Sequence, residues 1–167
     1  VVTGQTIYSA LDASDSSLDP EWTIENVSLA TGLNYVWSWK DYNGQYYLNA
    51  SAYAQNKANA ALAYCYSPVI SLDGFATAAF SFEHAAKFQT TIKELCKAVV
   101  RAEGATEWTD LEIPTWPGTT SWAFVNSGEI DLSAYVGKKV QIGFKYESSD
   151  AGADTWEIKN VKVTGTK

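Results

Sequence analysis

Several residue types and motifs that would indicate catalysis are scarce or missing in this sequence. The chain has 167 residues but no methionine, one histidine, two cysteines and four prolines. A single histidine cannot supply a metal centre that needs several imidazole ligands. A Ser-His-Asp site would have to use His84, yet no Gly-x-Ser-x-Gly elbow, phosphate-binding glycine loop or dinucleotide fingerprint is present. Since no pair of carboxylates is marked for glycoside hydrolysis either, we expect no catalytic residues.

Positive charge and long apolar runs are also scarce. Lys and Arg number 12 against 19 Asp and Glu, for a net charge of −7, and form no cluster denser than Lys138 and Lys139. Nucleic-acid binding needs a cationic surface that displaces counterions, so we expect no such partner. No apolar run approaches a membrane span, so we expect no direct membrane insertion. Because neither a signal peptide nor an initial Met opens the chain, we expect a processed or excised piece of a longer product.

Aromatic residues, in contrast, are abundant. Hydrophobic residues make up 46% of the chain and charged residues 19%, which is enough apolar material for a core. Aromatic residues make up 14%, with 7 Trp and 10 Tyr. Packing alone rarely needs so many, and exposed Trp and Tyr are favoured in recognition surfaces. The length predicts one domain spanning residues 1–167, with an N-terminal segment at 1–20 that is partly irregular, and the composition favours binding over catalysis.

Alternation of apolar and polar residues predicts short, half-buried strands. Val140, Ile142, Phe144 and Tyr146 alternate with polar or small residues, and so do Ala78, Phe80 and Phe82. In residues 156–163 the apolar set begins at Trp156 and Ile158 and continues at Val161 and Val163, which predicts a bulge near Asn160. Turn signals separate these runs at residues 43–44, 73–74, 117–118, 127–128 and 136–137.

Two stretches contain helix formers but lack an apolar stripe at helical spacing. We interpret residues 50–63 as a loop plus a strand, and residues 83–101 as a loop followed by a strand. Many short strands with regular turns predict an all-β chain that folds as an antiparallel β-sandwich.

One hairpin carries most of the functional information. Asn43 and Gly44 suit a two-residue type I′ turn, which places Tyr42 opposite Gln45. One face of the hairpin then sets large rings against small or aliphatic partners, as core packing requires: Tyr35, Trp37, Trp39, Asp41, Tyr46, Leu48, Ala50 and Ala52. The other face is polar and yet aromatic: Val36, Ser38, Lys40, Tyr42, Gln45, Tyr47, Asn49 and Ser51. A register slip of one residue would exchange the two faces.

The polar face has the chemistry of a sugar-binding surface. A sugar presents an apolar C–H face and a rim of hydroxyls, so it needs a ring to stack on and hydrogen-bonding groups beside it. The candidate ligand-binding residues on this face are Lys40, Tyr42, Gln45, Tyr47 and Asn49. The alternative is a solvated sheet face that carries tyrosines. Trp116, in a loop flanked by Pro and Gly, is a further candidate, or else a ring that caps the end of the sandwich.

Two further features leave alternatives open. Cys65 and Cys96 are either two small buried residues or the partners of one disulfide. Acidic residues gather in two places, and oxygen ligands of this kind suit calcium: Asp12, Asp15 and Asp19, and then Asp150 and Asp154. Neither group has the spacing of an EF-hand loop, so we expect solvated acidic loops and no cofactor, with a structural calcium ion as the alternative.

Five stretches resemble, in order, the signature of the jelly-roll modules called cleaved-adhesin or choice-of-anchor domains. They are residues 67–74 (SPVISLDG), 79–86 (AFSFEHAA), 122–135 (WAFVNSGEIDLSAY), 140–146 (VQIGFKY) and 156–161 (WEIKNV). Such modules occur in secreted and surface proteins of Bacteroidetes-type bacteria. The resemblance implies a galactose-binding-like sandwich, non-catalytic and located outside the cell or on its surface. The shared motifs are mostly core and turn residues, so they imply no binding residue.

The sequence therefore predicts a non-catalytic carbohydrate-binding or adhesion module of a larger surface protein. Its expected partner is a glycan or a cell-surface protein. The alternatives are a module that binds another protein through the same aromatic surface, and a structural spacer without a small ligand, in which most Trp and Tyr would be buried.

Overall fold

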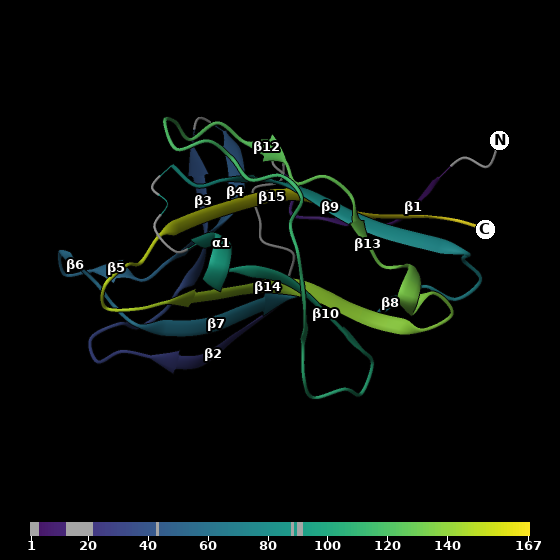
Figure 1. Ribbon diagram of the computed structural model, residues 1–167, viewed down its shortest axis with the longest axis horizontal. Coiled ribbons are helices and arrows are strands. Elements are labelled where there is room, and N and C mark those ends of the chain that lie inside the picture. Colours follow the sequence, from purple (N-terminus) through teal and green to yellow (C-terminus); the bar gives the residue numbers. More distant parts are fainter. Residues whose placement is uncertain (1–3, 13–21, 43, 88, 90–91) are drawn as a thin grey trace.

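The strands of this chain form two layers that face each other (Figure 1). The computed structural model describes residues 4–12, 22–42, 44–87, 89 and 92–167. All pairings between named strands in these residues are antiparallel, and the two layers pack on one hydrophobic core. The chain is thus an antiparallel β-sandwich of the jelly-roll type, as its apolar alternation predicted.

The first sheet has seven strands and includes both halves of the predicted hairpin. Its main path runs β12 (Val125–Asn126), β9 (Thr77–Ala85), β15 (Thr155–Thr166), β4 (Gln45–Ser51) and β3 (Trp37–Tyr42). In addition, β1 (Gln5–Ala10) pairs with β15, and β13 (Ile130–Asp131) pairs with β9. Part of the N-terminal segment is therefore a regular strand.

The second sheet has six strands and forms the opposite layer. Its main path runs β11 (Thr109–Leu111), β10 (Lys97–Ala102), β14 (Lys139–Ser148), β7 (Ala61–Tyr66) and β2 (Thr23–Leu29), and β8 (Ile70–Ser71) pairs with β14. Two short strands, β5 (Tyr53–Ala54) and β6 (Lys57–Ala58), form a separate hairpin between β4 and β7.

The core between the sheets is built around rings from both layers. Phe144 of the second sheet lies 4.9 Å from Phe82 and 5.7 Å from Trp156 of the first sheet, measured between ring centroids. Trp22, which directly precedes β2 of the second sheet, stacks on Phe144 at 6.1 Å. All the residues that the alternation assigned to the interior are buried, namely Ala78, Phe80, Phe82, Val140, Ile142, Phe144, Tyr146, Trp156, Ile158, Val161 and Val163.

The predicted bulge in the last strand is confirmed. The pairing of β15 with β9 shifts register between Lys159 and Lys162. Asn160 takes a left-handed backbone conformation, with φ 52°. This extra residue returns Val161 to the core side after Ile158, so a strand of 12 residues keeps an apolar inner face along its length.

The prediction for residues 83–101 was wrong in two respects. Strand β9 continues to Ala85, and a one-turn helix, α1 (Ile92–Leu95), precedes β10. The buried carboxylate of Asp154 accepts a hydrogen bond from the Ile92 N–H at 2.9 Å, so a tertiary contact holds the first turn. A local pattern cannot show a helix start that depends on a residue so distant in sequence. A 3-10 turn at Ser133–Tyr135 follows β13.

The cysteines and the acidic groups have the following placements. Cys65 and Cys96 are both buried and free, which agrees with the alternative of two small buried residues. Asp15 and Asp19 lie outside the described residues. In the described part of the chain no three His, Cys, Asp or Glu side chains are placed to hold a metal ion. None of the helices described there is long and apolar enough to cross a membrane.

Candidate functional site

The β3–β4 hairpin has the register that its turn predicted. Tyr42 pairs with Gln45, Lys40 with Tyr47, Trp39 with Leu48 and Trp37 with Ala50. Asn43 lies outside the described residues, and Gly44 has φ 79°, which a glycine adopts without strain. The register therefore puts two different surfaces on the two sides of the hairpin.

The expected core face is buried only in part. Trp37, Leu48, Ala50 and Ala52 are buried. Toward the turn, Trp39 and Tyr46 stack on each other at 6.3 Å and are half-buried, and Asp41 is exposed. Tyr35, which precedes β3, is also exposed, so Tyr35 and Asp41 do not belong to the core as expected.

The polar face of the hairpin forms one wall of an open cavity of about 590 Å³. We call this cavity the aromatic cavity. It is lined by Tyr42, Gln45, Tyr47, Trp122, Phe124, Glu157 and Lys159. Three of these side chains are predicted ligand-binding residues. Glu157 and Lys159 come from β15, the strand beside β4, and Trp122 and Phe124 come from the loop that leads into β12.

Rings and polar groups contact each other in this cavity. The rings of Tyr47 and Phe124 lie 6.1 Å apart and are tilted by 57°. The ammonium of Lys159 lies 4.3 Å from the centre of the Phe124 ring and donates a hydrogen bond to Gln45 Oε1 at 3.5 Å. These two contacts hold the Lys159 side chain in place on the side of the cavity that β15 forms. Tyr42 is 71% exposed and Trp122 is 37% exposed, so two large rings remain accessible to a ligand.

Glu157 has an unusual electrostatic environment. Burial raises the pKa of its carboxyl from 4.5 to about 7, although the positive charge of Lys40 and a hydrogen bond with Tyr47 act in the opposite direction. Burial and the charge of Glu157 likewise raise the pKa of the Tyr47 phenol. Near neutral pH the Glu157 carboxyl is thus present in both protonation states, and its neutral form can donate as well as accept a hydrogen bond.

Lys40 and Asn49 lie on the same face but line a neighbouring cavity of about 200 Å³, which we call the edge cavity. Asn49 is 5% exposed and pairs with Glu157 across the strands. The structure therefore brings Tyr42, Gln45 and Tyr47 together and places Lys40 and Asn49 next to them.

Trp116 lies elsewhere. Its ring stacks on Trp156 at 5.7 Å and lies 5.1 Å from the His84 ring, and it is half-buried against the core. His84 Nε2 donates a hydrogen bond at 2.7 Å to the carbonyl of Thr115, the residue before Trp116. This position agrees with a ring that caps the sandwich, and Trp116 does not line the aromatic cavity.

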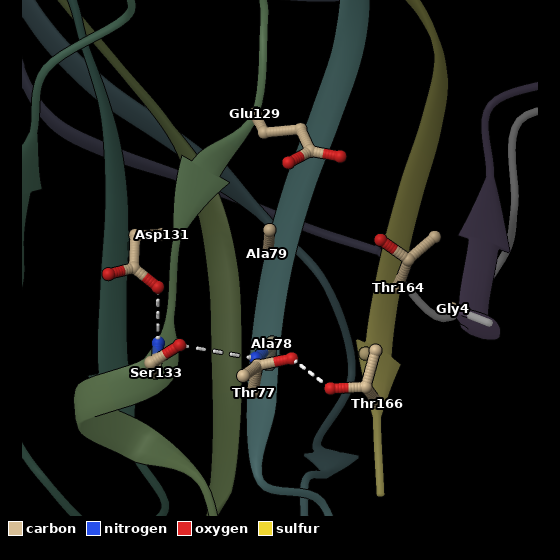
Figure 2. A pocket seen from close by; sticks show the side chains of 10 residues that line it. Gly4, Thr77, Ala78, Ala79, Glu129, Asp131, Ser133, Thr164 and Thr166 are labelled. Carbon is tan, nitrogen blue, oxygen red and sulfur yellow. Dashed lines mark hydrogen bonds between the residues drawn. The ribbon is translucent and has the colours of Figure 1, made fainter. Parts of the chain in front are cut away.

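A second cavity, of about 430 Å³, has different chemistry, and we call it the polar cavity. Figure 2 shows hydroxyls of β9 and β15 beside the carboxylates of Glu129 and Asp131. Asp131 accepts a hydrogen bond from Ser133 N at 2.9 Å, and hydrogen bonds from Ser133 lower the pKa of Asp131. None of the described residues that line this cavity carries a ring, so they offer no surface on which a sugar could stack.

Sequence reasoning missed four residues of the aromatic cavity. Glu157 and Lys159 alternate with the inward residues Trp156 and Ile158, so the sequence pattern does place their side chains on the outer side of the strand. That β15 lies beside β4 is a long-range pairing with no local signal. Trp122 and Phe124 precede a two-residue strand and reach the cavity only because of the path of their loop.

Comparison with known proteins shows likeness in structure only. No protein-family model matches the chain, and no curated protein matches it in sequence. The K1 cleaved adhesin domain of Lys-gingipain from Porphyromonas gingivalis is similar, with a TM-score of 0.59, 12% identity, and coverage of 100% of this chain and 99% of that domain. The K3 domain of the same protein also has a TM-score of 0.59, at 13% identity, with coverage of 96% and 100%.

A carbohydrate-binding module is similar over the same length. TmCBM27, a module described for specific mannan recognition, has a TM-score of 0.56 and 10% identity, with coverage of 99% of both chains. At these identities the comparisons carry information on the fold alone. The chain therefore has the jelly-roll sandwich fold that cleaved adhesin domains and carbohydrate-binding modules share.

Proposed function

We propose that this chain is a non-catalytic carbohydrate-binding module and that a glycan binds in the aromatic cavity. The observation that carries the proposal is the set of side chains lining that cavity, with four rings around an amide, a carboxyl and an ammonium group. Ligand sites of proteins are typically concave and apolar, with a few polar groups that fix orientation. The polar cavity lacks the rings, which makes it the weaker candidate.

Each group has a role that follows from sugar chemistry. The exposed rings of Tyr42 and Trp122 offer apolar faces to the C–H surface of a sugar. Gln45, Lys159 and the partly protonated Glu157 supply hydrogen bonds to its hydroxyls. Lys40 and Asn49 lie beside this arrangement, where a neighbouring sugar unit would extend. Trp116 packs against the core. The loop ring that contacts the glycan is therefore Trp122, instead of Trp116 as expected.

Several features support a binding module over an enzyme. Glu157 is the only carboxylate among the residues lining the aromatic cavity, whereas hydrolysis of a glycosidic bond typically uses two. One structural neighbour is described as recognising mannan.

We further propose a single domain over residues 1–167 with an extracellular or cell-surface location, in agreement with the sequence resemblance and with the fold.

An adhesion module that binds a cell-surface protein is the second candidate. The observation that favours it is the likeness to two adhesin domains of Lys-gingipain. The same exposed rings would then contact a protein. Competition separates the two candidates, since a soluble glycan should displace a glycan partner and leave a protein partner bound.

The test is a binding screen on immobilised plant, host and microbial glycans, followed by titration of the strongest ligand. Trp122→Ala should weaken binding by about tenfold, because a central ring at an interface contributes about 1–2 kcal/mol. Ile24→Ala is the matched control, since Ile24 has the same 37% exposure but lies on the second sheet. If the folded protein binds no glycan in a broad panel, the proposal is wrong.

A further inference from the structure

The large exposed apolar side chains are distributed unequally between the two sheets. Among the described residues they comprise three aliphatic side chains, Ile24, Val27 and Val69, and four aromatic ones, Tyr35, Tyr42, Tyr53 and Trp122. All four aromatic residues line cavities on the outer side of the first sheet. The aliphatic ones line none of these cavities, so the most exposed rings gather on one side of the molecule.

The cavities on this side share residues and therefore adjoin one another. A third one, of about 600 Å³, which we call the hairpin cavity, extends from the outer end of β4 to the β5–β6 hairpin. Trp122 lines both this cavity and the aromatic cavity, and Tyr53 and Ser51 line both this cavity and the edge cavity. Shared lining residues thus connect the three cavities in series, with the hairpin cavity in the middle, and we call this series the groove.

The register of the strands gives the groove its direction. Outward residues of β4 and β15 lie opposite each other along it, Asn49 with Glu157 and Ser51 with Thr155. From Gln45 to Tyr53 the chain advances eight positions, which is about 25 Å at the rise of an extended strand. Tyr42 lies near one end and is 71% exposed, and Tyr53 lies near the other end and is 58% exposed.

We infer that this groove binds an internal segment of a linear, uncharged polysaccharide. The inference rests on the proposed function and names the ligand class of the same site. A single terminal sugar could stack on one ring only, whereas the accessible rings are spread over three adjoining cavities. Each ring suits one sugar unit of an extended chain. Between the rings lie the half-buried hydroxyls of Ser51 and Thr155, which are 3.3 Å apart, and each can form a further hydrogen bond to a sugar hydroxyl.

The charges in the groove favour an uncharged chain. The cations are Lys40 and Lys159, and each has an anionic or aromatic neighbour: Lys40 acts on Glu157, and Lys159 lies over the Phe124 ring. A sulfated or uronate polysaccharide carries a charge on many units and needs a row of unpaired cations. The groove carries no such row among its lining residues.

Titration calorimetry with oligosaccharides of increasing length tests this inference. The probes are the disaccharide and hexasaccharide of β-1,4-linked mannose and of β-1,4-linked glucose. We expect the hexasaccharide to bind at least about tenfold more tightly than the disaccharide of the same sugar. Tyr53→Ala should weaken hexasaccharide binding about fivefold and leave disaccharide binding unchanged, since the disaccharide occupies the aromatic cavity alone.

The controls separate the failure of this inference from failure of the proposed function. Val69→Ala, at an exposed position outside the groove, should change neither affinity, and near-ultraviolet circular dichroism confirms that each variant is folded. Equal affinity for both lengths, or a Tyr53→Ala effect that is the same for both, overturns the groove but leaves glycan binding in the aromatic cavity. If neither length of either sugar binds, the inference is overturned, whereas the proposed function is overturned only if the broad glycan panel also gives no ligand.

Discussion

The buried His84 should make the fold sensitive to acid. His84 Nε2 donates a hydrogen bond to the Thr115 carbonyl at 2.7 Å, and Nδ1 accepts one from Trp156 Nε1 at 3.0 Å. An indole nitrogen can only donate and a carbonyl can only accept, so these partners fit the neutral ring alone. A second proton on Nδ1 would face the Trp156 N–H. Burial accordingly lowers the pKa of His84 from 6.5 to about 4, although the Thr115 bond acts in the opposite direction.

The size of the effect follows from this pKa. As pH falls below 6.5 the unfolded chain binds a proton that the folded chain does not, so the free energy of unfolding decreases until about pH 4. Between pH 7.5 and pH 4.5 this loss is about 2.5 kcal/mol. Glu157 acts in the other direction, because its raised pKa lets the folded chain bind a proton first as pH falls through about 7. Since Glu157 is only half-buried, solvent screening reduces its contribution to about 1 kcal/mol.

The assay is urea unfolding followed by Trp fluorescence, in a background that removes the Glu157 contribution. Glu157→Gln should lose stability on going from pH 7.5 to pH 4.5, and Glu157→Gln with His84→Gln should lose about 2.5 kcal/mol less. The comparison cancels the titration of all other groups, which both variants share. Equal losses in the two variants would refute the reasoning.

Three further predictions concern stability and thiol reactivity. Gly143→Ala should lower the free energy of unfolding by about 2 kcal/mol or more, because the added Cβ would lie 2.6 Å from the Cys65 carbonyl oxygen. In the control Gly118→Ala the added Cβ has no atom within contact distance, so the free energy of unfolding should change by less than about 0.5 kcal/mol. Similar urea midpoints for the two variants would contradict this prediction. Asn160→Val should cost about 1–2 kcal/mol more than Asn160→Gly in the same assay, because the left-handed backbone at this bulge disfavours a β-branched residue; equal costs would count against it. Cys65 and Cys96 should not react with Ellman's reagent in the folded protein, because both are buried and burial raises the pKa of both thiols. Both should react once urea unfolds the chain. Rapid labelling of the folded protein would contradict this prediction.

Much of the fold was predictable from local patterns. The alternation in residues 140–146 and 156–163 identified two inward faces, and the change of phase near Asn160 identified the bulge. The turn at residues 43–44 predicted the hairpin register, and with it the polar face that holds Tyr42, Gln45 and Tyr47. These features depend on neighbours in sequence, so a single chain reveals them.

The other half of the candidate site depends on contacts between distant segments. Glu157 joins the site because β15 pairs with β4, about one hundred residues earlier in the chain. Trp122 joins it through an irregular loop, and sequence alone could not decide whether Trp116 is available to a ligand or caps the sandwich. The short helix α1 was missed for the same reason, since its first turn bonds to Asp154.

The most direct test of carbohydrate binding in the aromatic cavity is a heteronuclear NMR titration that follows the indole N–H signals of the seven Trp residues. The probes are the β-1,4-linked hexasaccharides of mannose and glucose. We expect the signals of Trp122 and of the Gln45 amide to shift on addition of sugar. The signals of the core residue Trp156 and of Trp108, which stacks on Tyr64 of the second sheet, should not shift. Shifts confined to Trp108, or no shift at saturating sugar, would contradict the account.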